Sequence, residues 1–122
     1  MLNNAVITGR LTKIPELKQV GDNQTPVVNF SLAVERDFSD DNNERKADFI
    51  PVVAWNGLAK FVAGNFGKGG AISVQGRLQS RNWEDAEGKR HYTIELVAEN
   101  AYFAGESKKM NEMVSETDLE YK

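Results

Sequence analysis

Apolar and polar side chains alternate over much of this chain, with the two-residue period of half-buried β-strands. Between Val28 and Val34, for example, every second residue is apolar. Such runs predict five strands, over residues 4–12, 27–36, 47–55, 71–83 and 91–104. Turn residues dominate between the first two runs, a polar loop is predicted over residues 38–46, and a charged hairpin tip over residues 84–89.

The period changes once, between the third and fourth runs. Apolar residues there follow helical spacing: Leu58, Phe61, Val62 and Phe66. Gly67 is predicted to cap the end of this helix, and Gly69 and Gly70 to form a turn. Three strands, one helix and two strands is the order of the five-stranded OB-fold barrel, an all-β fold with one helix between strands 3 and 4. A β-sandwich is the alternative, but it needs more strands than 122 residues supply.

Alternation also predicts which side chains face outward, because successive strand residues point to opposite faces. In the third run the predicted interior residues are Ile50, Val52 and Ala54, and the outward ones are Phe49, Val53 and Trp55. In the fourth run the predicted interior residues are Ile72, Val74, Gly76 and Leu78. The outward residues there are Ser73, Gln75, Arg77, Gln79, Arg81 and Trp83. Large rings and guanidinium groups therefore share one predicted surface, to which the polar loop adds Phe38.

Exposed rings beside cations suit a single-stranded nucleic acid, whose unpaired bases stack on aromatic side chains while Arg and Lys contact phosphates. Each residue also has a plainer interpretation. Phe49 and Trp55 could pack under the helix, Trp83 could pack within its hairpin, and the arginines could form an ordinary solvated face. The remaining large rings are assigned to the core by default: Phe30, Phe61, Phe66, Tyr92 and Phe103.

Composition narrows the chemistry further. The chain has no cysteine, which excludes disulfides, thiolate nucleophiles and Cys-based metal sites. Its one histidine, His91, supports no catalytic constellation, so no enzyme activity, cofactor or metal is predicted. Residues 1–10 do not resemble a signal peptide, and no apolar run approaches the roughly 20 residues that span a bilayer. We therefore expect a soluble cytoplasmic protein.

Charge is unevenly distributed. The net charge is −3, of which residues 106–122 contribute −2, leaving −1 for residues 1–105. Phosphate binding must therefore depend on a local basic surface and not on a global positive field. Residues 1–105 are predicted to form the domain, and residues 106–122 a short polar, acidic and disordered tail.

Several short segments follow one another in a specific order along residues 1–103. They include Met1-Leu-Asn-Asn, Val6-Ile-Thr-Gly-Arg-Leu-Thr, Pro15-Glu-Leu, Phe30-Ser-Leu-Ala-Val, Ala47-Asp-Phe, Val52-Val-Ala-Trp, Leu58-Ala, Lys68-Gly-Gly, Val74-Gln-Gly-Arg-Leu-Gln-Ser-Arg-Asn-Trp and Gly88-Lys-Arg. In these segments the chain resembles the bacterial and phage single-stranded DNA-binding protein family. The resemblance implies an OB-fold protomer, assembled as a homotetramer, that binds single-stranded DNA without sequence preference. Its implied role is to protect that DNA during replication, recombination and repair.

The family's functional positions map onto this sequence. The base-stacking positions match Phe38, Phe49, Trp55 and Trp83. Two basic positions match DNA contacts of the family, Lys68 and Arg81, and position and charge add Arg10, Arg36, Lys60 and Arg77. Members usually continue through a long linker to an acidic tip that docks replication and repair proteins, which residues 117–122 do not match. An OB-fold that binds RNA, or one that binds only proteins, remains the alternative function.

Overall fold

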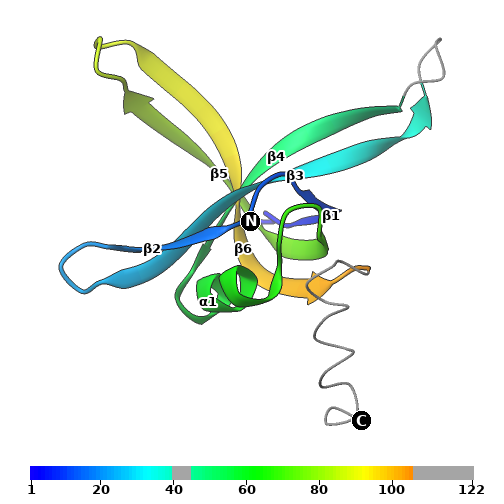
Figure 1. Ribbon diagram of the computed structural model, residues 1–122. Coiled ribbons are helices and arrows are strands. Elements are labelled where there is room, and N and C mark those ends of the chain that lie inside the picture. Colours follow the sequence, from blue (N-terminus) through cyan, green and yellow to red (C-terminus); the bar gives the residue numbers. More distant parts are fainter. Residues whose placement is uncertain (40–44, 106–122) are drawn as a thin grey trace, which may run out of the picture.

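The computed structural model describes residues 1–39 and 45–105 of the chain (Figure 1). These residues form six strands and one helix: β1 (Ala5–Leu11), β2 (Glu16–Val20), β3 (Thr25–Ser39), β4 (Arg45–Trp55), α1 (Asn56–Asn65), β5 (Ala71–Glu84) and β6 (Arg90–Phe103). The tail predicted for residues 106–122 lies outside the described residues. The helix in the described part of the chain is not long and apolar enough to cross a membrane.

Five of the strands close into a barrel. The order is β1-β5-β6-β4-β3, and β1 pairs with β3 to complete the ring. The β4–β6 pair is parallel, and the other pairs are antiparallel. The predicted all-β OB-fold with one helix is therefore confirmed, since α1 follows the third of the five barrel strands.

Strand β2 was missed by the sequence patterns. It pairs with β3 alone, from Glu16 opposite Asn29 to Val20 opposite Thr25. All five of its residues are exposed, so the strand lacks the buried alternate positions that reveal other strands. The prediction of a turn-rich stretch there was wrong, and α1 accordingly lies between β4 and β5 in the full count.

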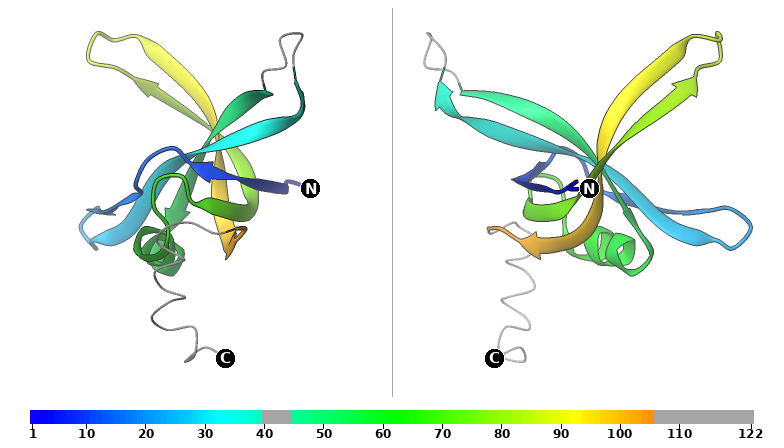
Figure 2. Two further views of the ribbon diagram at one scale, coloured as in Figure 1. Left: turned by 45° about the vertical axis from the view of Figure 1, so that its right-hand side comes forward. Right: turned by 180° about the vertical axis from the view of Figure 1, so that it is seen from behind.

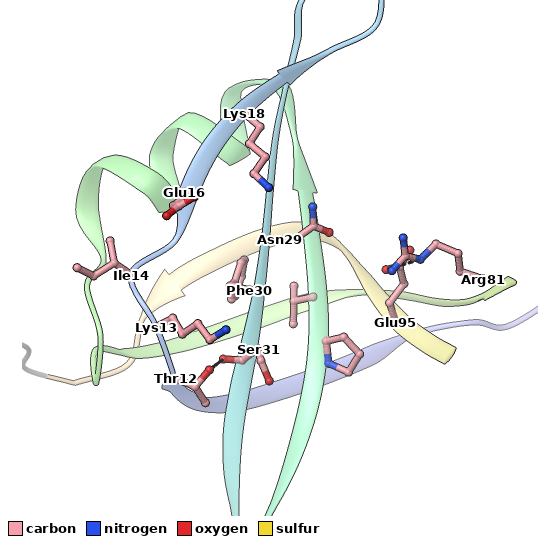
Figure 3. Close-up of a pocket in the computed structure, with 12 residues that line it drawn as sticks. Thr12, Lys13, Ile14, Glu16, Lys18, Asn29, Phe30, Ser31, Arg81 and Glu95 are labelled. Atoms are coloured by element: carbon pink, nitrogen blue, oxygen red, sulfur yellow. Dashed lines mark hydrogen bonds and ion pairs between the residues drawn. The ribbon is translucent and has the colours of Figure 1, made fainter. Parts of the chain in front are cut away.

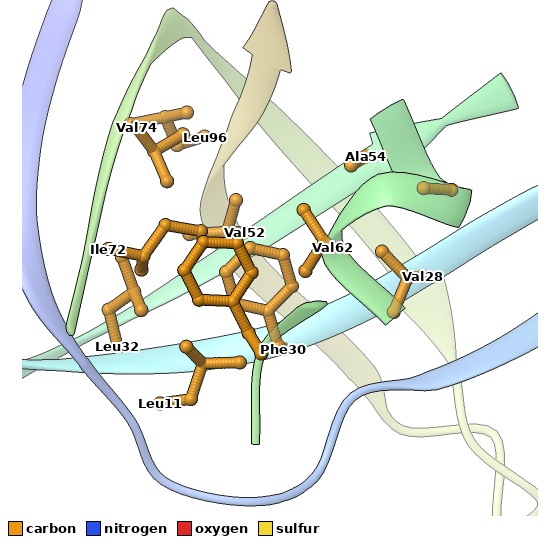
Figure 4. Packing of buried hydrophobic residues seen from close by; sticks show 12 residues of the cluster. Leu11, Val28, Phe30, Leu32, Val52, Ala54, Val62, Ile72, Val74 and Leu96 are labelled. Atoms are coloured by element: carbon orange, nitrogen blue, oxygen red, sulfur yellow. The ribbon is translucent and has the colours of Figure 1, made fainter. Parts of the chain in front are cut away.

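The core fills the barrel and the space under α1 (Figure 4). The fully buried large side chains are Leu11, Val28, Leu32, Val52, Val62, Phe66, Ile72, Val74 and Leu96. Phe66 packs against two further rings, with centroids 5.8 Å from Phe61 and 4.8 Å from Phe103. The helix ends earlier than predicted. Phe66, in an extended conformation, is its C-cap in place of Gly67, and the left-handed φ of +82° falls at Gly69.

Long hairpins extend beyond the barrel as arms. Figures 1 and 2 show the β3–β4 arm and the β5–β6 arm projecting from one side of the barrel, and the β2–β3 hairpin projecting separately. Strand pairing in the β5–β6 arm continues to Glu84 opposite Arg90. Each arm therefore exposes both of its faces, so alternation along an arm strand does not predict which of its residues are buried.

Several burial predictions fail for this reason. Leu78 was predicted to be interior but is 43% exposed, because it lies where β5 leaves the barrel. Tyr92, assigned to the core, is 65% exposed on the same arm. Phe103, also assigned to the core, lies away from the arms, opposite Ile72, and is 39% exposed although its ring stacks on Phe66. Conversely, Val53 has outward parity on β4 yet is buried. Ile50, Val52, Ala54, Ile72, Val74 and Gly76 are buried or half-buried as predicted.

Candidate nucleic-acid interface

A groove of about 510 Å³ opens on the outer surface of the barrel (Figure 3). Its walls come from the segment before β2 and from strands β2 to β6. The lining residues are Thr12, Lys13, Ile14, Glu16, Lys18, Asn29, Phe30, Ser31, Pro51, Val52, Arg81 and Glu95. Three cations and two carboxylates therefore meet over a partly apolar floor, and its size is in the range of small-molecule sites.

The β3–β4 ribbon carries two of the predicted rings on one face. In the antiparallel register Phe49 lies opposite Ala33, and Trp55 lies opposite Val27. The two rings are six residues apart on one strand and so about 20 Å apart. Phe49 is 65% exposed and Trp55 is 41% exposed, so α1 does not bury them. Both rings are open to a flat ligand.

Lysines of the groove were not identified from the sequence. Lys18 on β2 pairs with Val27, which in turn pairs with Trp55, so the three side chains form a row across three strands. Lys13 lies in the segment that leads into β2. Both were missed because β2 itself was not predicted, and without its register an isolated lysine carries no signal.

Arg81 contributes from β5. Its Nε lies 3.8 Å from Oε2 of Glu95, and its guanidinium carbon lies 4.9 Å from the centre of the Trp83 ring. The other oxygen of Glu95, Oε1, accepts a hydrogen bond from Nε2 of Gln79 at 3.1 Å. Arg81 therefore connects the groove to the indole on the arm, as Figure 3 shows for its end beside Glu95.

Trp83 lies near the tip of the β5–β6 arm, directly opposite His91. The two rings are stacked, with centroids 5.2 Å apart and planes at 20°. Nε2 of His91 is 2.7 Å from Oδ2 of Asp85, and the backbone N–H groups of Glu87 and Lys89 donate to Oδ1 of Asp85. The hydrogen bond with His91 and those two donors hold the pKa of the Asp85 carboxyl below its usual value. Alternation and spacing did not indicate that His91 lies against Trp83.

The remaining predicted cations are distributed outside the groove. On the β3–β4 arm, Arg36 donates from Nε and Nη2 to both oxygens of Asp48, at 3.1 and 2.8 Å. This pair raises the pKa of the guanidinium and lowers that of the carboxyl. Arg77 on β5 donates to Gln79 at 3.1 Å.

Arg10 donates from Nη1 to the carbonyl of Gly69 at 2.8 Å, which brings it to the turn that carries Lys68. Lys60 and Lys68 are exposed, the first on α1 and the second in that turn. The structure thus brings Arg81 to the groove but leaves five other predicted cations beyond it. The side chain of Phe38, at the end of β3, lies outside the described part of the structure.

An OB barrel with an outer groove, open rings and cations defines a protein of the single-strand-binding class. Residues 2–104 match the Single-strand binding protein family, and the chain belongs to this family. Its members are non-enzymatic proteins that bind single-stranded DNA.

Similar proteins carry the same description. A single-stranded DNA-binding protein of Caldanaerobacter subterraneus is 43% identical over 103 residues, which cover 84% of this chain and 68% of that protein. Single-stranded DNA-binding protein 3 of Streptococcus agalactiae is 46% identical over 100 residues, or 82% of this chain and 72% of that protein. Single-stranded DNA-binding protein 1 of Lactococcus lactis is 39% identical over all 122 residues and 81% of its own length.

Proposed function

We propose that this chain coats and protects single-stranded DNA in the cytoplasm during replication, recombination and repair. Bases stack on Phe49, Trp55 and Trp83, with Phe38 as a fourth ring. Phosphates are contacted by the predicted cations, namely Arg10, Arg36, Lys60, Lys68, Arg77 and Arg81, and by the groove lysines Lys13 and Lys18. The observation that carries the proposal is the row of Lys18, Val27 and Trp55, since it sets a cation that lines the groove in register with an open ring two strands away.

The test is a titration of oligo-dT into the protein, followed by tryptophan fluorescence at low and high salt. Strong quenching with modest salt dependence is expected, because stacking on an indole is less sensitive to salt than contact with phosphate. Replacing Trp55 or Trp83 with alanine should weaken binding by about 1–3 kcal/mol each, a range taken from OB-fold single-strand binders and not from this structure. Unchanged affinity in the double variant would remove both rings from the interface.

Tyr92→Ala is the matched control. Tyr92 is an exposed ring on the same arm as Trp83, but it pairs with Asn82 and so lies on the other face of the hairpin. Its replacement should leave the quenching of the indoles by oligo-dT unchanged when both proteins are compared in the same state of assembly, as sedimentation shows it. Matched RNA oligomers complete the experiment, since a clear preference for RNA would overturn the proposal in favour of an RNA-binding OB-fold.

The same proposal includes assembly into a homotetramer. Its support is the set of exposed apolar side chains that lie away from the groove, namely Val6, Leu78, Tyr92, Ile94 and Tyr102. Leu78, Tyr92 and Ile94 share one face of the β5–β6 arm, and covering such a face with a second copy would remove it from water. Sedimentation equilibrium should give the mass of four chains. A single-chain mass across the micromolar range would contradict this part of the proposal.

A further inference from the structure

The groove contains Glu95, whose negative charge does not favour the binding of a phosphate backbone. Among the described residues, Glu95 is the one charged side chain that is buried, with 6% of its surface exposed. Burying a carboxylate is costly unless it is paired and hydrogen-bonded, and its charge repels phosphate. Arg81 and Gln79 lie beside Glu95 and offset part of the first cost, so the question is what its second oxygen can do.

The hydrogen bonds of Glu95 are incomplete. Oε1 accepts from Gln79, but the 3.8 Å between Oε2 and Nε of Arg81 exceeds hydrogen-bond distance. Among the described residues, no group donates a hydrogen bond to Oε2. Arg81 supplies a compensating charge without using the acceptor. One carboxylate oxygen at the groove therefore retains capacity for a donor that the ligand brings.

The surroundings of Glu95 suit a flat heterocycle. Pro51 and Ser31 lie opposite each other in the β3–β4 register and both line the groove, as does the exposed Asn29. Pro51 offers an apolar ring without a backbone N–H, and Ser31 and Asn29 offer groups that donate or accept. A base seated here would meet apolar surface on one side and hydrogen-bonding groups at its edge.

We propose that Glu95 is a specificity residue that favours amino-bearing bases over thymine at this one position of the bound strand. The inference rests on the proposed function. Cytosine presents a 4-amino donor, which a carboxylate accepts, whereas thymine presents the O4 acceptor in the same place. Seated in the same way, thymine sets its O4 acceptor against Oε2, and it would have to shift along the groove to offer its N3–H instead. Overall binding stays sequence-tolerant, because the stacking rings accept every base.

The test compares oligo-dC with oligo-dT of equal length, at pH 8 and fixed salt, for the unchanged protein and for Glu95→Gln. The glutamine keeps the size of the side chain, loses one acceptor and gains an amide donor that suits O4 of thymine. We expect the ratio of the two dissociation constants to shift toward oligo-dT by about three- to tenfold, the effect of one net hydrogen bond. The general gain in phosphate affinity from losing a negative charge cancels in this ratio.

Glu99→Gln is the charge-matched control. Glu99 is exposed on the same strand and accepts a hydrogen bond from Gln75, and it does not line the groove. It should leave the dC-to-dT ratio unchanged. An oligomer whose cytosines lack the 4-amino group gives a second test on the ligand side. It should lose affinity relative to oligo-dC with the unchanged protein, and lose several-fold less with Glu95→Gln.

The outcomes separate the two proposals. If both oligomers bind the unchanged protein and Glu95→Gln does not change their ratio, Glu95 has no role in base selection and this inference is wrong. If neither oligomer binds the unchanged protein, the proposed function itself fails.

Discussion

Strands β5 and β6 each run from the barrel into the β5–β6 arm, and their two halves differ in how far their side chains are buried. In the barrel half, Ile72, Val74 and Leu96 are fully buried. In the arm half, Leu78 and Ile94 keep the inward parity of the barrel but are 43% and 49% exposed. Alternation therefore specifies which face a side chain takes, whereas burial also requires a second layer, which the closed barrel supplies and the arm lacks.

The difference has a functional counterpart. The barrel half is fixed by packing and supports the groove, while the arm half presents a different chemistry on each face. One face carries Arg81, Trp83 and His91, in contact with one another. The other carries the exposed apolar side chains of Leu78, Tyr92 and Ile94. Under the proposed function, stability and binding are thus separated along the length of two strands.

The largest effect is expected from Leu78 and Leu96, which lie opposite each other in the β5–β6 register but differ in burial. Leu96→Ala should lower the free energy of unfolding by about 2–5 kcal/mol, the usual cost of a cavity in a core. Leu78→Ala should change it by no more than about 0.5 kcal/mol, as for other surface positions. Urea denaturation at low protein concentration measures both.

Protein concentration serves as the control for this pair, because assembly stabilises whatever it covers. A loss for Leu78→Ala that appears only at high concentration would mean that a second copy covers the arm. If both variants lost the same free energy of unfolding at every concentration, the difference between arm and barrel would be contradicted, since the arm would then be packed as tightly as the barrel.

A second test concerns Gly76, near the point where β5 leaves the barrel. The register shifts between Gln75 and Gly76, and a Cβ at Gly76 would collide with the backbone carbonyl of Val97 on the neighbouring strand. Gly76→Ala should therefore lower the free energy of unfolding by about 1–3 kcal/mol. Gly64→Ala is the control, because its Cβ would meet nothing within 4 Å and alanine favours the helix by up to about 1 kcal/mol. Similar effects at both glycines would show that the strands separate easily at Val97.

Much of this organisation could be predicted from the sequence, because closed strands impose a clear period. The five barrel strands and α1 follow from alternation and its single interruption, and the outward positions of Phe49, Trp55 and Trp83 follow from parity. Strand β2 could not be predicted in this way, because a strand with every residue exposed has no apolar face.

The groove could not be predicted for a related reason. Its residues come from separate strands, and their proximity depends on register, which a single sequence does not specify. Glu95 looks like one more charge on a strand until Gln79 and Arg81 are found beside it. His91 likewise acquires a role only when it lies opposite Trp83. Alternation therefore predicts which face of a strand a side chain lies on, whereas the pairing of strands decides which side chains lie together in a site.

The smallest expected effect is a loss of contacts at low pH, which we expect at the tip of the β5–β6 arm and not in the barrel. The folded arm tip lowers the pKa of Asp85 below its ordinary 3.8, chiefly through the hydrogen bond with His91. A carboxyl with a lowered pKa stabilises the fold above its ordinary pKa, and this contribution is lost as the pH falls through the folded value. The tip should therefore keep its contacts at pH 5 and lose them only as the pH falls through the lowered pKa of Asp85, whereas the apolar side chains around Ile72 have no group that titrates.

NMR spectra recorded from pH 5 to pH 2 measure this difference. The amide signals of Glu87 and Lys89, which donate to Asp85, should shift with an apparent pKa below 3.8, while those of Ile72 and Val74 stay in place. Asp85→Asn keeps an oxygen that accepts the two backbone bonds but does not titrate, so the shift of the Lys89 amide, whose own side chain is not a carboxyl, should become much smaller in that variant. Barrel amides that moved together with the tip would mean that arm and barrel unfold as one unit, and the separation of binding from stability along β5 and β6 would be lost.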